Sequence, residues 1–286
     1  MLTLVFEDDS DAPASAGREV CVWRDDLGVT FARGFADDHR RWIEWREWGV
    51  FAFSLGSTLV HAWPAPGRSR AAVADVFARV LQPIILQGLG WQALHASAVL
   101  GAGGVLAFCG IGRSGKSTLA YALGHASFDQ IADDAVVIEP AGHGVLTHLL
   151  PFAPGLREPS RQHFGECIKA GPAGDSSNLP DKAWLRAVFV LRQDEGLSRP
   201  ETPQRVQPVQ AFSALVTHAR CFDESDAAHV RRLVADYLQV AERVPVFSLV
   251  YPPRFAQFGE LTDVITTTAR TVGILPRKGL RPSLVP

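Results

Sequence analysis

One short stretch of the sequence has the residue types and spacing of a phosphate-binding loop. Residues 110–117 fit the Walker A pattern G-x-x-x-x-G-K-[ST], in which glycines let the backbone curl so that its N–H groups point at phosphate oxygens. Lys116 would reach the β- and γ-phosphates, and the Ser117 hydroxyl would ligate Mg²⁺. The pattern predicts binding of a nucleoside triphosphate, with ATP and Mg²⁺ as the expected cofactors. We expect the phosphates to contact these consecutive residues: Gly110, Ile111, Gly112, Arg113, Ser114, Gly115, Lys116, Ser117 and Thr118.

The same glycines leave a second interpretation open. They also spell G-x-G-x-x-G, the dinucleotide fingerprint, and Asp133 and Asp134 lie about 20 residues further on. The Lys-Ser pair that follows Gly115 is superfluous for a dinucleotide and expected for a triphosphate. An apolar strand before the loop and a helix after it also suit a triphosphate, since the helix N-terminus favours anions. We therefore prefer the triphosphate.

Two adjacent carboxylates, Asp133 and Asp134, lie in the apolar stretch Ile131–Val137. Neighbouring residues of a strand point to opposite faces, so in a central strand both carboxylates cannot simply face solvent. Buried carboxylates need partners, and Mg²⁺ and a substrate hydroxyl would serve. The alternative is a pair of turn or edge aspartates.

Upstream of the loop, His95 begins the expected strand Leu94–Leu100. A lone histidine on an apolar strand is more often a core residue than a catalytic one, and both interpretations stay open. Further along, Arg157 and Arg161 could hold phosphate oxygens, because a guanidinium suits that geometry. Surface arginines are the alternative.

Taken together, these segments resemble a known family. The array of His95-Ala96-Ser97, the strand 105–108, the loop and Ile131-Ala132-Asp133-Asp134 is similar to the catalytic domain of HPr kinase/phosphorylase. It looks closest to the shorter HPr-kinase-like proteins of peptide-modification gene clusters, including lasso-peptide kinases. His95 lies 21 residues before Lys116 and Asp133 lies 17 after it, intervals that look like the family's own. The resemblance is specific over about residues 92–140, diffuse to about 270, and does not cover residues 1–66.

The resemblance implies roles for particular residues. Asp133 would act as the general base on a serine hydroxyl, and Asp134 would join Ser117 in the metal site. His95 would lie at the active site, where Lys116 would be a further catalytic residue. Related enzymes assemble, which makes a homo-oligomer one expectation.

The functional hypothesis is transfer of the γ-phosphoryl group of ATP to a serine (or threonine) of a peptide or protein. Three alternatives stay open: an NTP-hydrolysing P-loop protein, a small-molecule kinase, and a non-catalytic nucleotide-binding module. Each is separated from the first by what accepts the phosphoryl group.

Composition narrows the class of protein. The chain has 286 residues and a formal net charge of −2, so we expect neither a nucleic acid nor an anionic membrane as partner. The four cysteines form no C-x-x-C pair, which argues against a zinc site or a disulfide framework. The N-terminus turns acidic at once, unlike a signal peptide, and we find no stretch of about 18 apolar residues. The expected location is the cytoplasm.

The elements that must position these residues alternate in type. We expect an α/β fold whose core is HPr-kinase-like (PEP-carboxykinase-like), with a mixed sheet. Residues 1–66 are predicted to be a small β-rich region, and residues 67–275 a P-loop kinase-like domain that a helix over 70–86 leads into. The segment 129–139 is predicted to be one buried strand and 169–181 a lid. The tail 276–286 is basic and expected to be disordered.

Overall fold

The computed structural model describes residues 2–8, 17–24, 27–126, 128–152, 154–164 and 179–277. Contacts divide the chain into two units, one of residues 1–91 with 221–233 and one of residues 92–220 with 234–286. This division differs from the expected boundary after residue 66, because the helical stretch that follows groups with the first unit. The chain is a mixed α/β protein with two mixed sheets.

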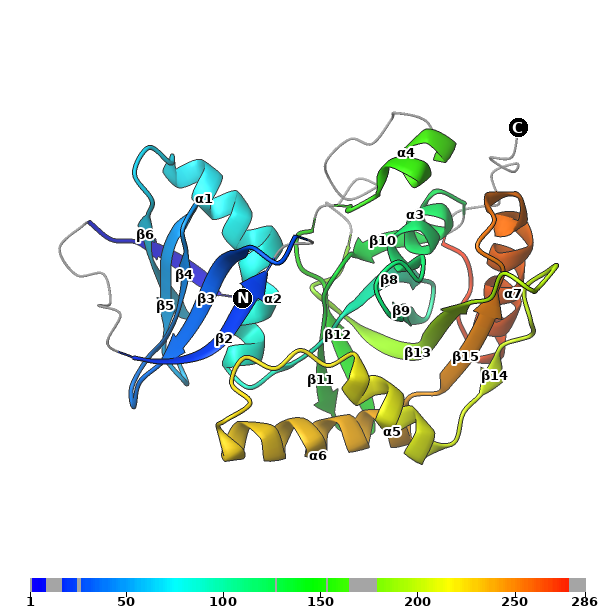
Figure 1. Cartoon of the computed structure of the whole chain (residues 1–286). Coiled ribbons are helices and arrows are strands. Elements are labelled where there is room, and N and C mark those ends of the chain that lie inside the picture. The colour runs from blue at the N-terminus through cyan, green and yellow to red at the C-terminus, as the bar shows by residue number, and fades with distance from the viewer. Residues whose placement is uncertain are drawn as a thin grey trace. The chain divides into compact units, whose positions relative to one another are not determined.

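The first unit holds a six-stranded sheet (Figure 1). Its strands, in spatial order, are β1 (Thr3–Phe6), β6 (Leu59–Pro64), β5 (Gly49–Phe53), β4 (Arg41–Trp45), β3 (Thr30–Ala36) and β2 (Arg18–Arg24). Only the β1–β6 pair is parallel among these neighbours. The tryptophan-rich stretch that begins at residue 41 forms the strand β4 and the turn after it. Trp42 of β4 packs face to face with Phe35 of β3, with 5.6 Å between the ring centroids.

Three consecutive helical segments follow in the same unit: α1 (Arg70–Val76), the π-helical η2 (Phe77–Leu81) and α2 (Gln82–Gly88). Ser69 caps α1, since its side chain accepts a hydrogen bond from the backbone N–H of Ala72. Pro83 lies in the first turn of α2, where a missing N–H costs little. The predicted helix over 70–86 is thus confirmed, with a π-helical turn before its proline.

The stretch Arg70–Gly88 also bears on the membrane expectation. Within the described residues, it is the one helical stretch that is long and apolar enough to pass a length-and-composition test for a membrane span. Half of it is buried inside the protein, and buried core helices can pass the same test. By itself it is weak evidence for a span.

The second unit holds the larger sheet. Its main path, in spatial order, is β10 (Asp129–Ala132), β8 (Ala96–Gly101), β9 (Gly104–Cys109), β13 (Lys182–Gln193), β12 (Gly144–His148), β11 (Val136–Ala141) and β7 (Gln92–Leu94). Strand β15 (Val246–Tyr251) pairs in parallel with β13, and the short β14 (Gln204–Arg205) pairs with β15. β13 is parallel to β9, whereas β8 is antiparallel to both β9 and β10.

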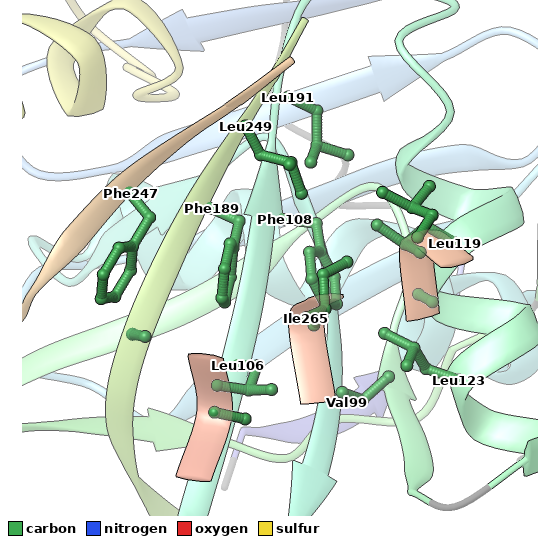
Figure 2. Close-up of a cluster of buried hydrophobic side chains, with 14 of the residues drawn as sticks. Val99, Leu106, Phe108, Leu119, Leu123, Phe189, Leu191, Phe247, Leu249 and Ile265 are labelled. Atoms are coloured by element: carbon green, nitrogen blue, oxygen red, sulfur yellow. The ribbon is translucent and has the colours of Figure 1, made fainter. Parts of the chain in front are cut away.

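Helices complete this unit: α3 (Lys116–Ala126), α4 (Glu158–Phe164), α5 (Pro208–Thr217), α6 (Ala227–Arg243), whose first half groups with the first unit, η4 (Phe255–Gln257) and α7 (Phe258–Thr271). The main apolar core lies between β8, β9, β13 and β15 and the helices α3 and α7 (Figure 2). Phe189 of β13 lies at its centre and stacks on Phe108 of β9 at 5.7 Å and on Phe247 of β15 at 5.3 Å.

Two predicted strands are wrong in the same way. The segment 129–139 is not one strand, since β10 ends at Ala132 and β11 begins at Val136, with the aspartate pair in the bend between them. The predicted strand Leu94–Leu100 is broken at His95, which separates β7 from β8. In both places the chain leaves one strand partner for another, and periodicity along the sequence carries no sign of that exchange.

Several segments stay outside the described residues. Most of the proposed lid 169–181 is among them, with only residues 179–181 described. Most of the tail 276–286 is also outside, and Cys167 falls in the same undescribed stretch as the lid.

We expect Phe189→Ala to lower the free energy of unfolding by about 3–5 kcal/mol, because it removes a fully buried ring at the centre of the core. The matched control is Val209→Ala, whose side chain is 81% exposed and should change stability by no more than about 0.5 kcal/mol. Urea denaturation followed by circular dichroism measures both. Equal effects of the two substitutions would contradict this placement of the core.

Candidate active site

The antiparallel pairing of β8 brings three chain segments to one edge of the larger sheet. Ala96, the first residue of β8, pairs with Cys109, the last residue of β9. Ala98 of β8 pairs with Ala132, the last residue of β10. The histidine before β8, the loop after β9 and the aspartates after β10 therefore leave the sheet at the same edge.

The glycine-rich loop is held in a tight backbone shape that glycine permits. Gly115 has φ +84°, and a Cβ there would lie 2.2 Å from the Tyr251 hydroxyl oxygen. That hydroxyl donates a 2.6 Å hydrogen bond to the backbone carbonyl of Ser114. Ser114 Oγ is buried with no hydrogen-bond partner among the described residues. A buried hydroxyl without a partner is costly, and an anion's oxygen would satisfy it.

Lys116, the first residue of α3, points back into the loop. Its side chain is buried, and Nζ donates to the carbonyls of Gly110 at 2.8 Å and Ile111 at 3.2 Å. Burial lowers the pKa of Lys116, and the carboxylates of Asp134 and Asp133 oppose that shift in part. The two aspartates therefore lie within electrostatic reach of the loop lysine.

The Asp133 carboxylate accepts hydrogen bonds from three donors. Ser97 Oγ donates to Oδ1 at 2.7 Å, the backbone N–H of Asp134 donates to the same oxygen at 3.1 Å, and the backbone N–H of Gly155 donates to Oδ2 at 2.6 Å. Ser97 is on β8 and Gly155 lies just before α4, so two elements fix the orientation of this carboxylate.

The Asp134 carboxylate has different partners. Arg220 Nη2 lies 2.7 Å from Oδ2, and His95 Nδ1 lies 3.1 Å from Oδ1. Burial raises the pKa of Asp134, but the hydrogen bond with His95 and the positive charge of Arg220 outweigh it and lower the pKa to about 2. Much of the Asp134 side chain is still solvent-accessible, so bulk screening weakens each pairwise interaction.

Arg220 is the site residue that the sequence did not reveal. It lies 125 positions from His95 in the chain, and no motif surrounds it. The backbone places it, because His95 N donates to His218 O at 2.7 Å and Arg220 N donates to Ala93 O at 2.8 Å. Arg220 Nη2 is also 3.0 Å from His95 Nδ1, which ties the histidine and the carboxylate to one guanidinium.

A cavity of about 450 Å³ opens beside the loop. It is lined by residues of the loop, of the start of α3, of the segment around α4 and of the segments that follow β13 and β15: Arg113, Ser114, Gly115, Lys116, Ser117, Thr118, Gly155, Arg157, Pro159, Ser160, Gln193, Pro253, Phe255 and Phe258. Of the two arginines predicted to contact phosphate, Arg157 is in this lining. The other, Arg161, donates from Nε to the Leu156 carbonyl at 2.8 Å.

The residues proposed for the metal fit Mg²⁺ only as part of a ligand set. No group of three or more His, Cys, Asp or Glu side chains in the described parts of the chain could hold a metal by itself. Mg²⁺ commonly keeps several waters and binds through one or two carboxylates plus substrate phosphates. The Ser117 hydroxyl and the Asp134 carboxylate suit that mode, with the remaining ligands coming from phosphate and water.

Comparisons with known proteins add little. No family model matches the chain, and no curated protein matches it. Among solved structures, the HPr(Ser) kinase/phosphatase from Coxiella burnetii is similar over 63% of this chain and 97% of its own, with 10% sequence identity and a TM-score of 0.36. A likeness this weak supports no conclusion about fold or activity.

Gly115→Ala should damage the loop, because the new Cβ would clash with the Tyr251 hydroxyl and φ is positive. We expect a loss of about 1–3 kcal/mol in the free energy of unfolding. Gly112→Ala is the matched control within the same loop, since a Cβ there meets nothing within 4 Å. Thermal unfolding measures both, and equal stability of the two variants would contradict the loop geometry.

The Asp134 cluster should make stability depend on acid. A carboxyl whose folded pKa is about 2 and whose unfolded pKa is about 3.9 stabilises the fold above pH ~4, and loses that contribution as pH falls toward 2. Arg220→Ala should raise the pKa of Asp134 and reduce the acid-dependent loss, whereas Arg199→Ala on the exposed surface should not. Carboxyl NMR titration and urea denaturation between pH 2 and 6 measure the two effects. An unchanged pKa in Arg220→Ala would contradict the pairing.

Proposed function

We propose that this chain is an ATP-dependent phosphotransferase that moves the γ-phosphoryl group of ATP to a serine (or threonine) hydroxyl of a peptide or protein. The second unit would be an HPr-kinase-like P-loop core. The observation that carries the proposal is the convergence at one sheet edge of the loop lysine, the Asp133 carboxylate and the Asp134–His95–Arg220 cluster. A phosphate-binding loop alone would only hold a nucleotide, whereas an oriented carboxylate next to it can accept a proton.

Phosphate binding falls to the loop and the start of α3. Inward-facing backbone N–H groups and the helix N-terminus favour the β- and γ-phosphates, and the unpartnered Ser114 hydroxyl lies among them. Lys116 Nζ is held by the carbonyls of Gly110 and Ile111, so it is already positioned at the loop before a phosphate arrives. Mg²⁺, held by Ser117 and Asp134, would neutralise charge on the phosphate oxygens.

Proton transfer falls to Asp133. In the transfer, the acceptor oxygen bonds to the γ-phosphorus, the bond from that phosphorus to the β,γ-bridging oxygen breaks, and the hydroxyl proton passes to Asp133. Ser97 and Gly155 hold the carboxylate from two sides, which keeps its orientation without supplying a countercharge. Most of the rate would come from positioning and charge stabilisation.

His95 and Arg220 act through Asp134 as positioning residues. Both lie against its carboxylate, and the guanidinium also donates to the Asp134 backbone carbonyl at 3.0 Å. This fixes the bend that carries both aspartates. It also places a permanent positive charge beside the site where negative charge moves from the γ-phosphoryl group to the leaving phosphate.

Asp133→Asn tests the proposal, because it keeps the shape of the side chain and removes the base. We expect phosphoryl transfer to fall by about 10²–10⁴-fold with ATP binding retained. The measurement is transfer of label from [γ-³²P]ATP to an array of serine- and threonine-containing peptides, with mass spectrometry of co-expressed neighbouring gene products to find the natural acceptor. Asp263→Asn, on the exposed face of α7, is the matched control.

The outcomes separate the alternatives. Full transfer by Asp133→Asn would overturn the assignment of the base. ATP hydrolysis with no phosphorylated acceptor would favour an NTP-hydrolysing protein, and transfer to small molecules alone would favour a small-molecule kinase. Tight ATP binding with no turnover on any acceptor would favour a binding module.

A further inference from the structure

The cavity beside the loop has two chemically different ends. Arg113, Lys116 and Arg157 bring three cationic side chains to the loop end. The apolar side chains of the lining are Pro159, in the first turn of α4, and three residues after β15: Pro253, Phe255 and Phe258. No carboxylate is among the described residues that line it. A positive end joined to an uncharged apolar end is complementary to a polyanion that carries a flat, neutral, hydrophobic group.

Sheet order tells which way such a ligand must point. β8 and β10 lie on one side of β9, and β13 and β15 lie on the other. Asp133 and His95 belong to the first side. Gln193 and Tyr251, the last residues of β13 and β15, are paired with each other on the second side. A phosphate chain lying on the loop after β9 would therefore have its reacting end toward Asp133. Its other end would point toward the apolar wall that Pro253, Phe255 and Phe258 form.

Packing against the core and ring stacking hold the apolar wall in place. Phe258, the first residue of α7, packs against the main core, and Phe255 of η4 stacks on it with 5.6 Å between ring centroids and 28° between planes. His163 of α4 stacks on Phe255 at 4.5 Å and 20°. Phe255 is half-buried, so part of its surface is covered by protein and part meets the cavity.

We propose that this wall, formed by Pro253, Phe255 and Phe258, binds the nucleobase of the phosphoryl donor. The inference rests on the proposed function and deepens it, since it assigns the base of the donor to named residues and distinguishes a nucleoside triphosphate from an inorganic polyphosphate. The cavity volume of about 450 Å³ lies within the usual range of small-ligand sites, roughly 300–1,000 Å³. Gln193 is the last residue of β13, which lies between β9 and β15 in the sheet. A ribose that follows the phosphates would lie beside it.

The test compares two probes on the full chain: a non-hydrolysable ATP analogue, which carries a base, and inorganic triphosphate, which does not. Calorimetry with Mg²⁺ present gives each affinity. The wild type should bind the ATP analogue at least 10-fold more tightly than triphosphate. Phe255→Ala should weaken the ATP analogue by about 10-fold, equivalent to about 1.4 kcal/mol, and change triphosphate binding by less than about 2-fold.

Two further variants guard against a folding defect. Phe255→Leu keeps most of the apolar surface and should stay within about 3-fold of wild type for the ATP analogue. Val209→Ala removes an exposed apolar side chain outside the cavity and should change neither affinity. Thermal unfolding confirms that each variant is folded.

Two results would overturn the inference while leaving phosphoryl transfer intact. One is that Phe255→Ala lowers the affinity for both probes equally. The other is that the wild type binds triphosphate as tightly as the ATP analogue. A wild type that binds neither probe and transfers no phosphoryl group would instead overturn the proposed function itself. Loss of ATP-analogue affinity alone, with triphosphate affinity retained, is the result expected.

Discussion

The antiparallel pairing of β8 with both β9 and β10 is the constraint on which the candidate site depends. If β8 ran parallel to β9, the histidine would leave the sheet at the edge opposite the loop. Because it is antiparallel, the start of β8 meets the end of β9, and the end of β10 meets the start of β8. Strand direction therefore brings the three segments of the site to the same edge of the sheet, where their side chains are close enough to interact.

Charge balance then explains why these groups stay together. A lysine inserted among buried atoms is destabilised in its charged form, and burial lowers the pKa of Lys116 accordingly. The aspartates oppose this shift, so the loop and the bend stabilise each other's ionised forms. The hydrogen bond with His95 and the positive charge of Arg220 play the same part for Asp134, whose pKa is held near 2 against the effect of burial. Removing the aspartates would leave the buried charge of Lys116 without these partners, whereas solvent screening limits the corresponding cost at the exposed Asp134 side chain.

Local patterns in the sequence reveal much of this arrangement, whereas contacts between residues far apart in the chain leave no such pattern. The loop follows from eight consecutive residues, and the apolar run Val246–Tyr251, which forms β15, is likewise a local signal. A turn at the aspartate pair was only the alternative interpretation, because apolar residues continue on both sides of it, although two adjacent aspartates inside such a run are a signal for a turn. Arg220 could not be predicted from the sequence, since its role arises from a backbone contact between residues 93–95 and 218–220. The helical turn of α4 was missed because its residues carry no apolar period.

Backbone conformation marks the same edge of the sheet. Within the described residues, the two non-glycine residues with positive φ are Arg113 in the loop, at 66°, and Asp134 in the bend, at 71°. Such conformations cost energy for residues with a Cβ and persist only where surrounding contacts fix them. The contacts are present, since Tyr251 holds the loop through Ser114, and Arg220 holds both the side chain and the carbonyl of Asp134. A fold that needed these turns only to reverse the chain could place glycine at both positions. Strain in the loop after β9 and in the bend after β10, each held by a side chain from a distant strand or loop, is what a site built to keep charged groups in fixed positions requires.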